Sequence, residues 1–114
     1  MASNFIRKIL PKVGVTAVQF PDAVATKTEV TVIGLSLANI ISTAVKASVF
    51  LRYKSGAGTA DVYLIKNMDV IPGQTQVLVG GDQKLVLLPG DTIWVTSNTA
   101  ASLDCIMSML VISY

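Results

Sequence analysis

Apolar and polar residues alternate with a period of two along much of the chain, which is the pattern of β-strands that bury one face. Residues 44–54 show it most clearly, because Val45 and Val49 fall on one face while Lys46 and Arg52 fall on the other. Residues 28–39 differ, since large groups such as Leu35 alternate with small ones rather than with charges. We expect that strand to be packed on both faces.

The strongest local pattern is a short apolar run, a turn and a second alternating run over residues 83–97. Pro89 presets φ at the first corner of a turn, Gly90 accepts positive φ, and Asp91 can hydrogen-bond to the local backbone. The segment therefore predicts an antiparallel hairpin with Pro89, Gly90 and Asp91 as its structural turn.

The last segment, residues 103–114, is apolar at both odd and even positions. A helix is the competing interpretation, because methionine and leucine favour helices. Residues 98–102 have the composition of a loop, and the run from Val111 to Tyr114 favours a strand. We therefore predict a strand here.

Together these segments predict an all-β fold, namely a single-domain antiparallel β-sandwich, jelly-roll-like, with about seven to nine strands. The expected strands cover residues 13–20, 28–39, 44–54, 59–66, 68–71, 75–79, 84–88, 92–96 and 103–114.

The first fourteen residues lack a clean period. Phe5, Ile6 and Ile9 could share one face of a helical turn, but Pro11 would end it at once. We expect residues 1–14 to be an extended N-terminal arm that lies on a partner, and residues 15–114 to be the β-sandwich domain. The residues expected at the interface are Phe5, Ile6, Arg7, Lys8, Ile9, Leu10, Trp94, Met107 and Met109.

Composition suggests why such an interface is needed. Hydrophobic residues make up 52% of the 114 residues and charged residues only 14%, against about 25% charged in typical soluble domains. A membrane span needs about 20 apolar residues, but the charge-free residues 30–45 are interrupted by polar ones. Arg7 and Lys8 also argue against a signal peptide. We therefore expect the apolar excess to be buried in a protein assembly.

Chemistry-bearing residues are few. The chain has no histidine, one cysteine and a net charge of +2, which argues against histidine-based catalysis, a zinc site and a nucleic-acid groove. Its carboxylates are scattered, and no glycine-rich phosphate loop is present. We expect no enzyme activity, no cofactor, no metal and no catalytic residue. Cys105 is expected to be a small buried apolar residue.

Aromatic residues leave one alternative of another class open. Trp94, Tyr53, Tyr63 and Tyr114 could form a platform on which sugar rings stack, as in a carbohydrate- or receptor-binding module. With aromatics at 6% of the chain, packing in the core or at an interface is the favoured interpretation.

Residues 59–114 resemble small β-rich virion proteins of tailed bacteriophages, in which a similar strand–turn–strand precedes an alanine/serine loop and a final apolar strand. The matching residues are Lys84, Leu85, Val86, Leu87, Gly90, Asp91, Ile93, Val95, Ser97, Ala100, Ala101 and Ser102.

The resemblance implies a non-enzymatic structural protein of the virion, assembled in the bacterial host cytoplasm. Our leading hypothesis is a head decoration or cement protein that forms a homo-oligomer, such as a trimer, and stabilises the major capsid protein lattice. A neck, tail or baseplate component is the alternative. Partners would be further copies of the chain and other virion proteins, with no nucleic acid and no membrane.

Overall fold

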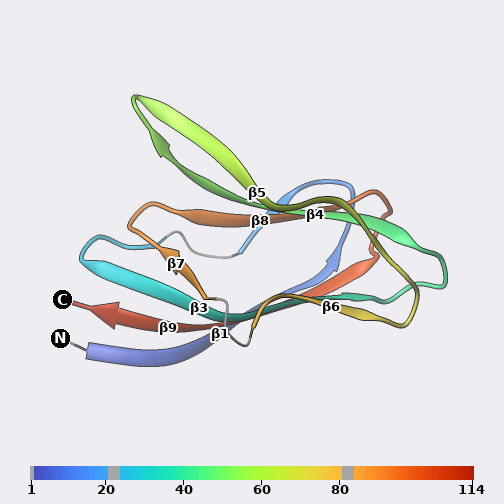
Figure 1. The fold of residues 1–114 in the computed structure, drawn as a ribbon, viewed down its shortest axis with the longest axis horizontal. Coiled ribbons are helices and arrows are strands. Elements are labelled where there is room, and N and C mark those ends of the chain that lie inside the picture. The colour runs from blue at the N-terminus through green and yellow to red at the C-terminus, as the bar shows by residue number, and fades with distance from the viewer. Residues whose placement is uncertain (1, 21–23, 81–83) are drawn as a thin grey trace.

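The computed structural model describes residues 2–20, 24–80 and 84–114, which form nine β-strands (Figure 1). They are β1 (Ala2–Val13), β2 (Val18–Gln19), β3 (Thr28–Asn39), β4 (Val45–Ser55), β5 (Gly58–Val70), β6 (Thr75–Val79), β7 (Leu85–Leu87), β8 (Thr92–Ser97) and β9 (Leu103–Ser113). Across these ranges we find no helical segment that could span a membrane.

The strands form two antiparallel sheets that face each other (Figure 1). The first sheet has the order β1-β9-β3-β6, and β7 pairs with residues 30–32 of β3 while β6 pairs with residues 35–38. The second sheet has the order β2-β8-β4-β5. The pairs are nested along the chain, because β4 pairs with β5, β3 with β6 and β7, β2 with β8, and β1 with β9. A long antiparallel ribbon rolled onto itself gives this order, and the predicted jelly-roll-like sandwich is confirmed.

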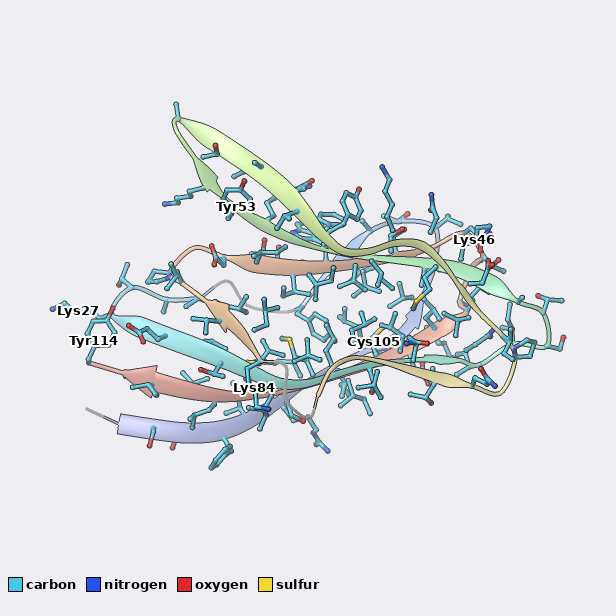
Figure 2. The ribbon with its side chains drawn as sticks, viewed as in Figure 1. Lys27, Lys46, Tyr53, Lys84, Cys105 and Tyr114 are labelled. Carbon is cyan, nitrogen blue, oxygen red and sulfur yellow. The ribbon has the colours of Figure 1, made fainter. Side chains whose placement is uncertain are left out.

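The core lies between the sheets and follows the period of two. In β4, Val45, Ala47 and Val49 are buried, as their alternation predicts. In β8, Ile93 and Val95 point to the same core. Each fully buried valine, leucine or isoleucine contributes about 1.5–3 kcal/mol to stability. Strand β9 contributes Leu103, Cys105, Met107 and Met109 to the same core. Figure 2 shows side chains filling the space between the two sheets.

The expected N-terminal arm is instead the edge strand β1, which pairs with β9 almost throughout its length. Leu10 and Val13 of this strand belong to the hydrophobic core. Pro11 does not end the strand, because it lies in a register shift at the sheet edge, where a missing N–H is tolerated. Lys12 takes a φ of 52°, and its backbone N–H donates to Asp104 Oδ1 at 2.9 Å.

The expected hairpin over residues 83–97 is also wrong, although its turn forms. The N–H of Asp91 donates to the carbonyl of Leu88 at 3.0 Å, and Gly90 has a φ of 90°. The flanking strands separate, however, since β7 pairs with β3 in the first sheet and β8 pairs with β4 and β2 in the second. The turn therefore carries the chain from one sheet to the other. Residues 81–83 lie outside the described ranges.

A register shift in β3 and the continuity of β5 correct further details of the pattern. The pairing of β3 with β9 shifts between Val32 and Gly34, so Val32 and Leu35 both face the core. The strict alternation expected for residues 28–39 therefore fails after Val32. The two strands expected at residues 59–66 and 68–71 are one strand, β5, in which Asn67 has a φ of 53°.

Candidate interaction surface

The face of the first sheet that points away from the second sheet is rich in exposed apolar side chains. Five of them define what we call the outer apolar face, and their exposed fractions are 76% for Phe5, 53% for Ile9, 60% for Val77, 56% for Val86 and 49% for Ile106. They come from four strands: β1, β6, β7 and β9.

Strand register lines these residues up in rows across the sheet. In one row, Phe5 lies opposite Leu110, Leu110 opposite Thr31, and Thr31 opposite Val86. Cross-strand neighbours on one face of a sheet are in contact distance. The row is therefore a continuous, largely apolar strip from β1 to β7.

A second row runs parallel to the first. Ile9 lies opposite Ile106, Ile106 opposite Ser36, and Ser36 opposite Val77. Arg7 lies between the two rows on β1 and is exposed. The five side chains of the outer apolar face present on the order of 500 Å² of apolar surface, near the upper end for the largest patch of a monomeric protein.

The edge of this face is open at β1. Within the described residues, β1 pairs with β9 on one side and with no strand on the other. An edge strand offers unpaired backbone N–H and C=O groups to any strand that approaches. The outer apolar face and the β1 edge are thus contiguous surfaces suited to contact with protein.

The structure divides the residues that the sequence assigns to an interface. Phe5, Arg7 and Ile9 lie on the outer apolar face, while Ile6 and Lys8 point between the two sheets and line a pocket there.

The assignment of Leu10, Met107 and Met109 to the interface is corrected, because all three are buried in the core. The methionines lie on the inner face of β9, which is paired on both sides. The sequence did not assign three exposed residues to the interface, namely Val77, Val86 and Ile106. Alternation with a period of two does not show which apolar face of a strand is covered by the second sheet.

Trp94 lies on the outer face of the second sheet, within a packed cluster. Its ring is parallel to that of Phe50, with centroids 6.2 Å apart, and the guanidinium of Arg52 sits 4.6 Å above the Trp94 ring. Arg52 Nε donates to Asp61 Oδ1 at 2.8 Å, and this hydrogen bond lowers the pKa of the Asp61 carboxyl. Tyr63 packs on the other side of Phe50, at 5.2 Å.

This cluster argues against a sugar-stacking platform. A stacking platform needs an open ring face, and Arg52 lies over Trp94. Tyr114 follows β9 of the first sheet, so it does not join Trp94 and Tyr63 on the second sheet. Tyr114 therefore shares no surface with Trp94 and Tyr63.

The remaining reactive group is Cys105, which lies between the sheets (Figure 2). Burial raises the pKa of its thiol to about 12, with a further contribution from the charge of Asp104. A thiol that stays protonated is a poor nucleophile and metal ligand. Among the described residues, no three histidine, cysteine or acidic side chains are grouped to hold a metal ion.

Comparison with known proteins gives only distant similarity. No family model matches the chain, and no curated protein matches it significantly. A solved structure of Bacillus endospore appendages, described as disulfide-linked pili, aligns with 98% of this chain and 87% of that chain at 14% identity and a TM-score of 0.48. A structure of infectious bursal disease virus, Gt strain, aligns with 97% of this chain and 30% of that chain at 10% identity and a TM-score of 0.46.

Proposed function

We propose that this chain is a non-enzymatic structural subunit of a bacteriophage particle, and specifically a head decoration or cement protein. It acts as a homo-oligomer in the virion and stabilises the capsid lattice by binding the major capsid protein. The observation that carries the proposal is the outer apolar face, with Phe5, Val77 and Val86 each more than half exposed.

The size of this face suits a shared interface. A stable interface buries about 800 Å² on each partner, and its centre is apolar and poor in charge. The outer apolar face supplies on the order of 500 Å² of such a centre. The sheet beneath it is held by backbone hydrogen bonds, so little ordering is needed when a partner binds.

The non-enzymatic part of the proposal rests on composition and burial. The chain has no histidine, and its single cysteine is buried with its pKa raised to about 12. On the second sheet Arg52 is paired with Asp61 and Lys46 with Asp69. These pairs have the geometry of cross-strand structural contacts.

The deciding experiment is electron microscopy of the intact source particle. We expect regularly spaced density over the capsid that fits the two-sheet fold, with the outer apolar face covered by a neighbour. Density confined to a neck, tail or baseplate ring would replace the decoration role with the alternative. Absence of the protein from the particle would overturn the proposal.

A binding assay tests whether the outer apolar face, rather than another surface of the molecule, contacts the particle. Purified Phe5→Glu protein is expected to bind particles that lack the native protein at least tenfold more weakly than the unaltered chain, because a carboxylate would be buried in the contact. Val62→Glu, at an exposed position of β5 in the second sheet, is the control and should bind normally (Figure 1). Equal loss in both variants would contradict the assignment of this face.

A further inference from the structure

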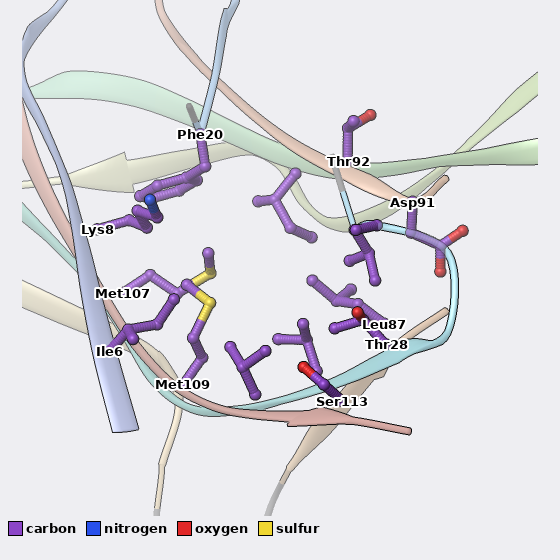
Figure 3. Close-up of a pocket in the computed structure, with 15 residues that line it drawn as sticks. Ile6, Lys8, Phe20, Thr28, Leu87, Asp91, Thr92, Met107, Met109 and Ser113 are labelled. Atoms are coloured by element: carbon purple, nitrogen blue, oxygen red, sulfur yellow. The ribbon is translucent and has the colours of Figure 1, made fainter. Parts of the chain in front are cut away.

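A pocket of about 230 Å³ lies between the two sheets, partly open to solvent and away from the outer apolar face (Figure 3). Its walls are buried apolar side chains from both sheets and from the loop residues beside them. They include Phe20, Val30, Leu87, Ile93, Met107 and Met109.

Backbone hydrogen bonds shape one side of this pocket. The N–H of Val24 donates to the carbonyl of Asp91 at 3.2 Å, and the N–H of Gly90 donates to the carbonyl of Val24 at 2.8 Å. The N–H of Tyr114 donates to the carbonyl of Lys27 at 2.9 Å. Val24 and Lys27 are therefore tied to the turn before β8 and to the end of β9. These bonds hold the backbone of both residues in place on that side of the molecule.

The polar side chains around the pocket are less buried than its walls and are engaged locally. Figure 3 places Lys8, Thr28, Asp91, Thr92 and Ser113 around the periphery, and all five are partly or fully exposed. Asp91 Oδ2 accepts from the N–H of Leu88 at 2.9 Å, and the hydroxyl of Thr28 donates to the carbonyl of Thr26 at 3.3 Å. The interior therefore offers mainly apolar contact.

The volume and the lining define what would fit. An apolar cavity of about 150 Å³ in another protein stays dry and binds benzene, so about 230 Å³ accepts a larger hydrocarbon body. Met107 and Met109 form part of the wall, and thioether side chains adapt to irregular apolar shapes.

We propose that this pocket is a binding site for a small molecule whose apolar body contains roughly ten carbon atoms, as in a medium-length acyl chain or a bicyclic aromatic ring. The site is separate from the outer apolar face, and the inference does not depend on the role proposed above. Among the described residues that line the pocket, Lys8 is the basic one.

The test is a titration of the full chain, labelled with ¹³C at its methionine methyl groups, with indole and with decanol. We expect saturable shifts of the Met107 and Met109 signals. Met68 is the internal control, because it packs against the core from β5 but does not line the pocket. No saturable shift up to the solubility limit of either probe, or an equal shift of Met68, would overturn the proposal.

Two variants examine the same site by different routes. Val111→Phe fills the pocket from β9, and Ala25→Trp narrows it from an exposed position without altering the core. Each should weaken probe binding at least tenfold, while Val86→Phe on the outer apolar face should not. If Val111→Phe does not fold, Ala25→Trp decides, and binding at unaltered affinity in that variant would overturn the proposal.

Comparing the affinities of decanoate and decanol then shows whether the site prefers an anionic or a neutral head group. Tighter binding of decanoate that is lost in Lys8→Met would assign an anionic amphiphile to the site. Equal affinity of the two probes would assign a neutral ligand. Either result supports the pocket, because both require the apolar body to occupy it.

Discussion

Cys105 shows how position in the sandwich controls the chemistry of one residue. Its ordinary pKa of 9.0 rises to about 12, because burial disfavours the thiolate. Above pH 9 the unfolded chain releases this proton while the folded chain keeps it. The stability contributed by this shift is therefore fully present below pH 9 and is lost as pH rises towards 12.

We predict that the free energy of unfolding falls more steeply with pH between 9 and 12 in the unaltered chain than in Cys105→Ala. The difference between the two slopes should be about 1.4 kcal/mol per pH unit, which corresponds to one proton. Denaturant unfolding at several pH values measures both slopes, and the variant cancels the titration of lysines and tyrosines. Parallel slopes would show that the thiol is not held protonated by the fold.

Gly90 is the residue whose backbone conformation the turn requires. Its φ is 90°, and an added Cβ would approach Lys54 Cε to 3.3 Å. We predict that Gly90→Ala lowers the free energy of unfolding by about 1–2 kcal/mol. Gly58→Ala is the control, because Gly58 has no positive φ and open space around it. Chemical denaturation of the two variants should separate them clearly; equal stabilities would contradict the role of the turn.

At the scale of elements, β1 is the clearest difference between expectation and structure. Phe5 and Ile9 are exposed, as expected for an arm that contacts a partner, but Leu10 and Val13 of the same strand are part of the hydrophobic core. We predict that Leu10→Ala lowers the free energy of unfolding by about 2–5 kcal/mol, because it leaves a cavity between the sheets.

The neighbouring Ile9→Ala is the matched control for that variant. Ile9 is exposed on the outer apolar face, so its truncation should change the stability of the isolated chain by about 0.5 kcal/mol or less. Urea unfolding of both variants measures the contrast. Similar small effects in both would mean that residues 1–14 behave as an arm after all.

At the scale of the whole molecule, the jelly-roll order leaves one face of the first sheet uncovered. We predict that Val77→Asp reduces homo-oligomer formation, because Val77 lies on the outer apolar face and a charge there would be desolvated on association. Sedimentation velocity over a range of concentrations measures this.

Val62→Asp is the matched control, since Val62 is also exposed on a strand but belongs to the second sheet. It should leave the oligomeric state unchanged. Thermal unfolding of both variants checks that the fold is intact. A monomeric unaltered chain at all concentrations would contradict the homo-oligomer.

Local sequence patterns were enough to predict the strand class, most strand positions and the turn chemistry at Pro89, Gly90 and Asp91. These are local properties: alternation depends on neighbours two residues apart, and positive φ at Gly90 depends on its missing Cβ. The inward face of β4 and the strand nature of residues 103–113 followed from the same signals. The shortage of charge in the composition likewise predicted that the single chain cannot bury all of its apolar side chains, and Phe5 and Val77 are exposed.

Strand pairing, and therefore the choice of which apolar faces are covered, depends on contacts between segments that are distant in the sequence. The turn at residues 89–91 is compatible with a hairpin and with a passage between sheets, and long-range backbone hydrogen bonds select the latter. The register shift after Val32 changes which residues of β3 face the core. The burial of Met107, the exposure of Val86 and the pocket between the sheets all depend on pairing between distant segments, which local alternation does not encode.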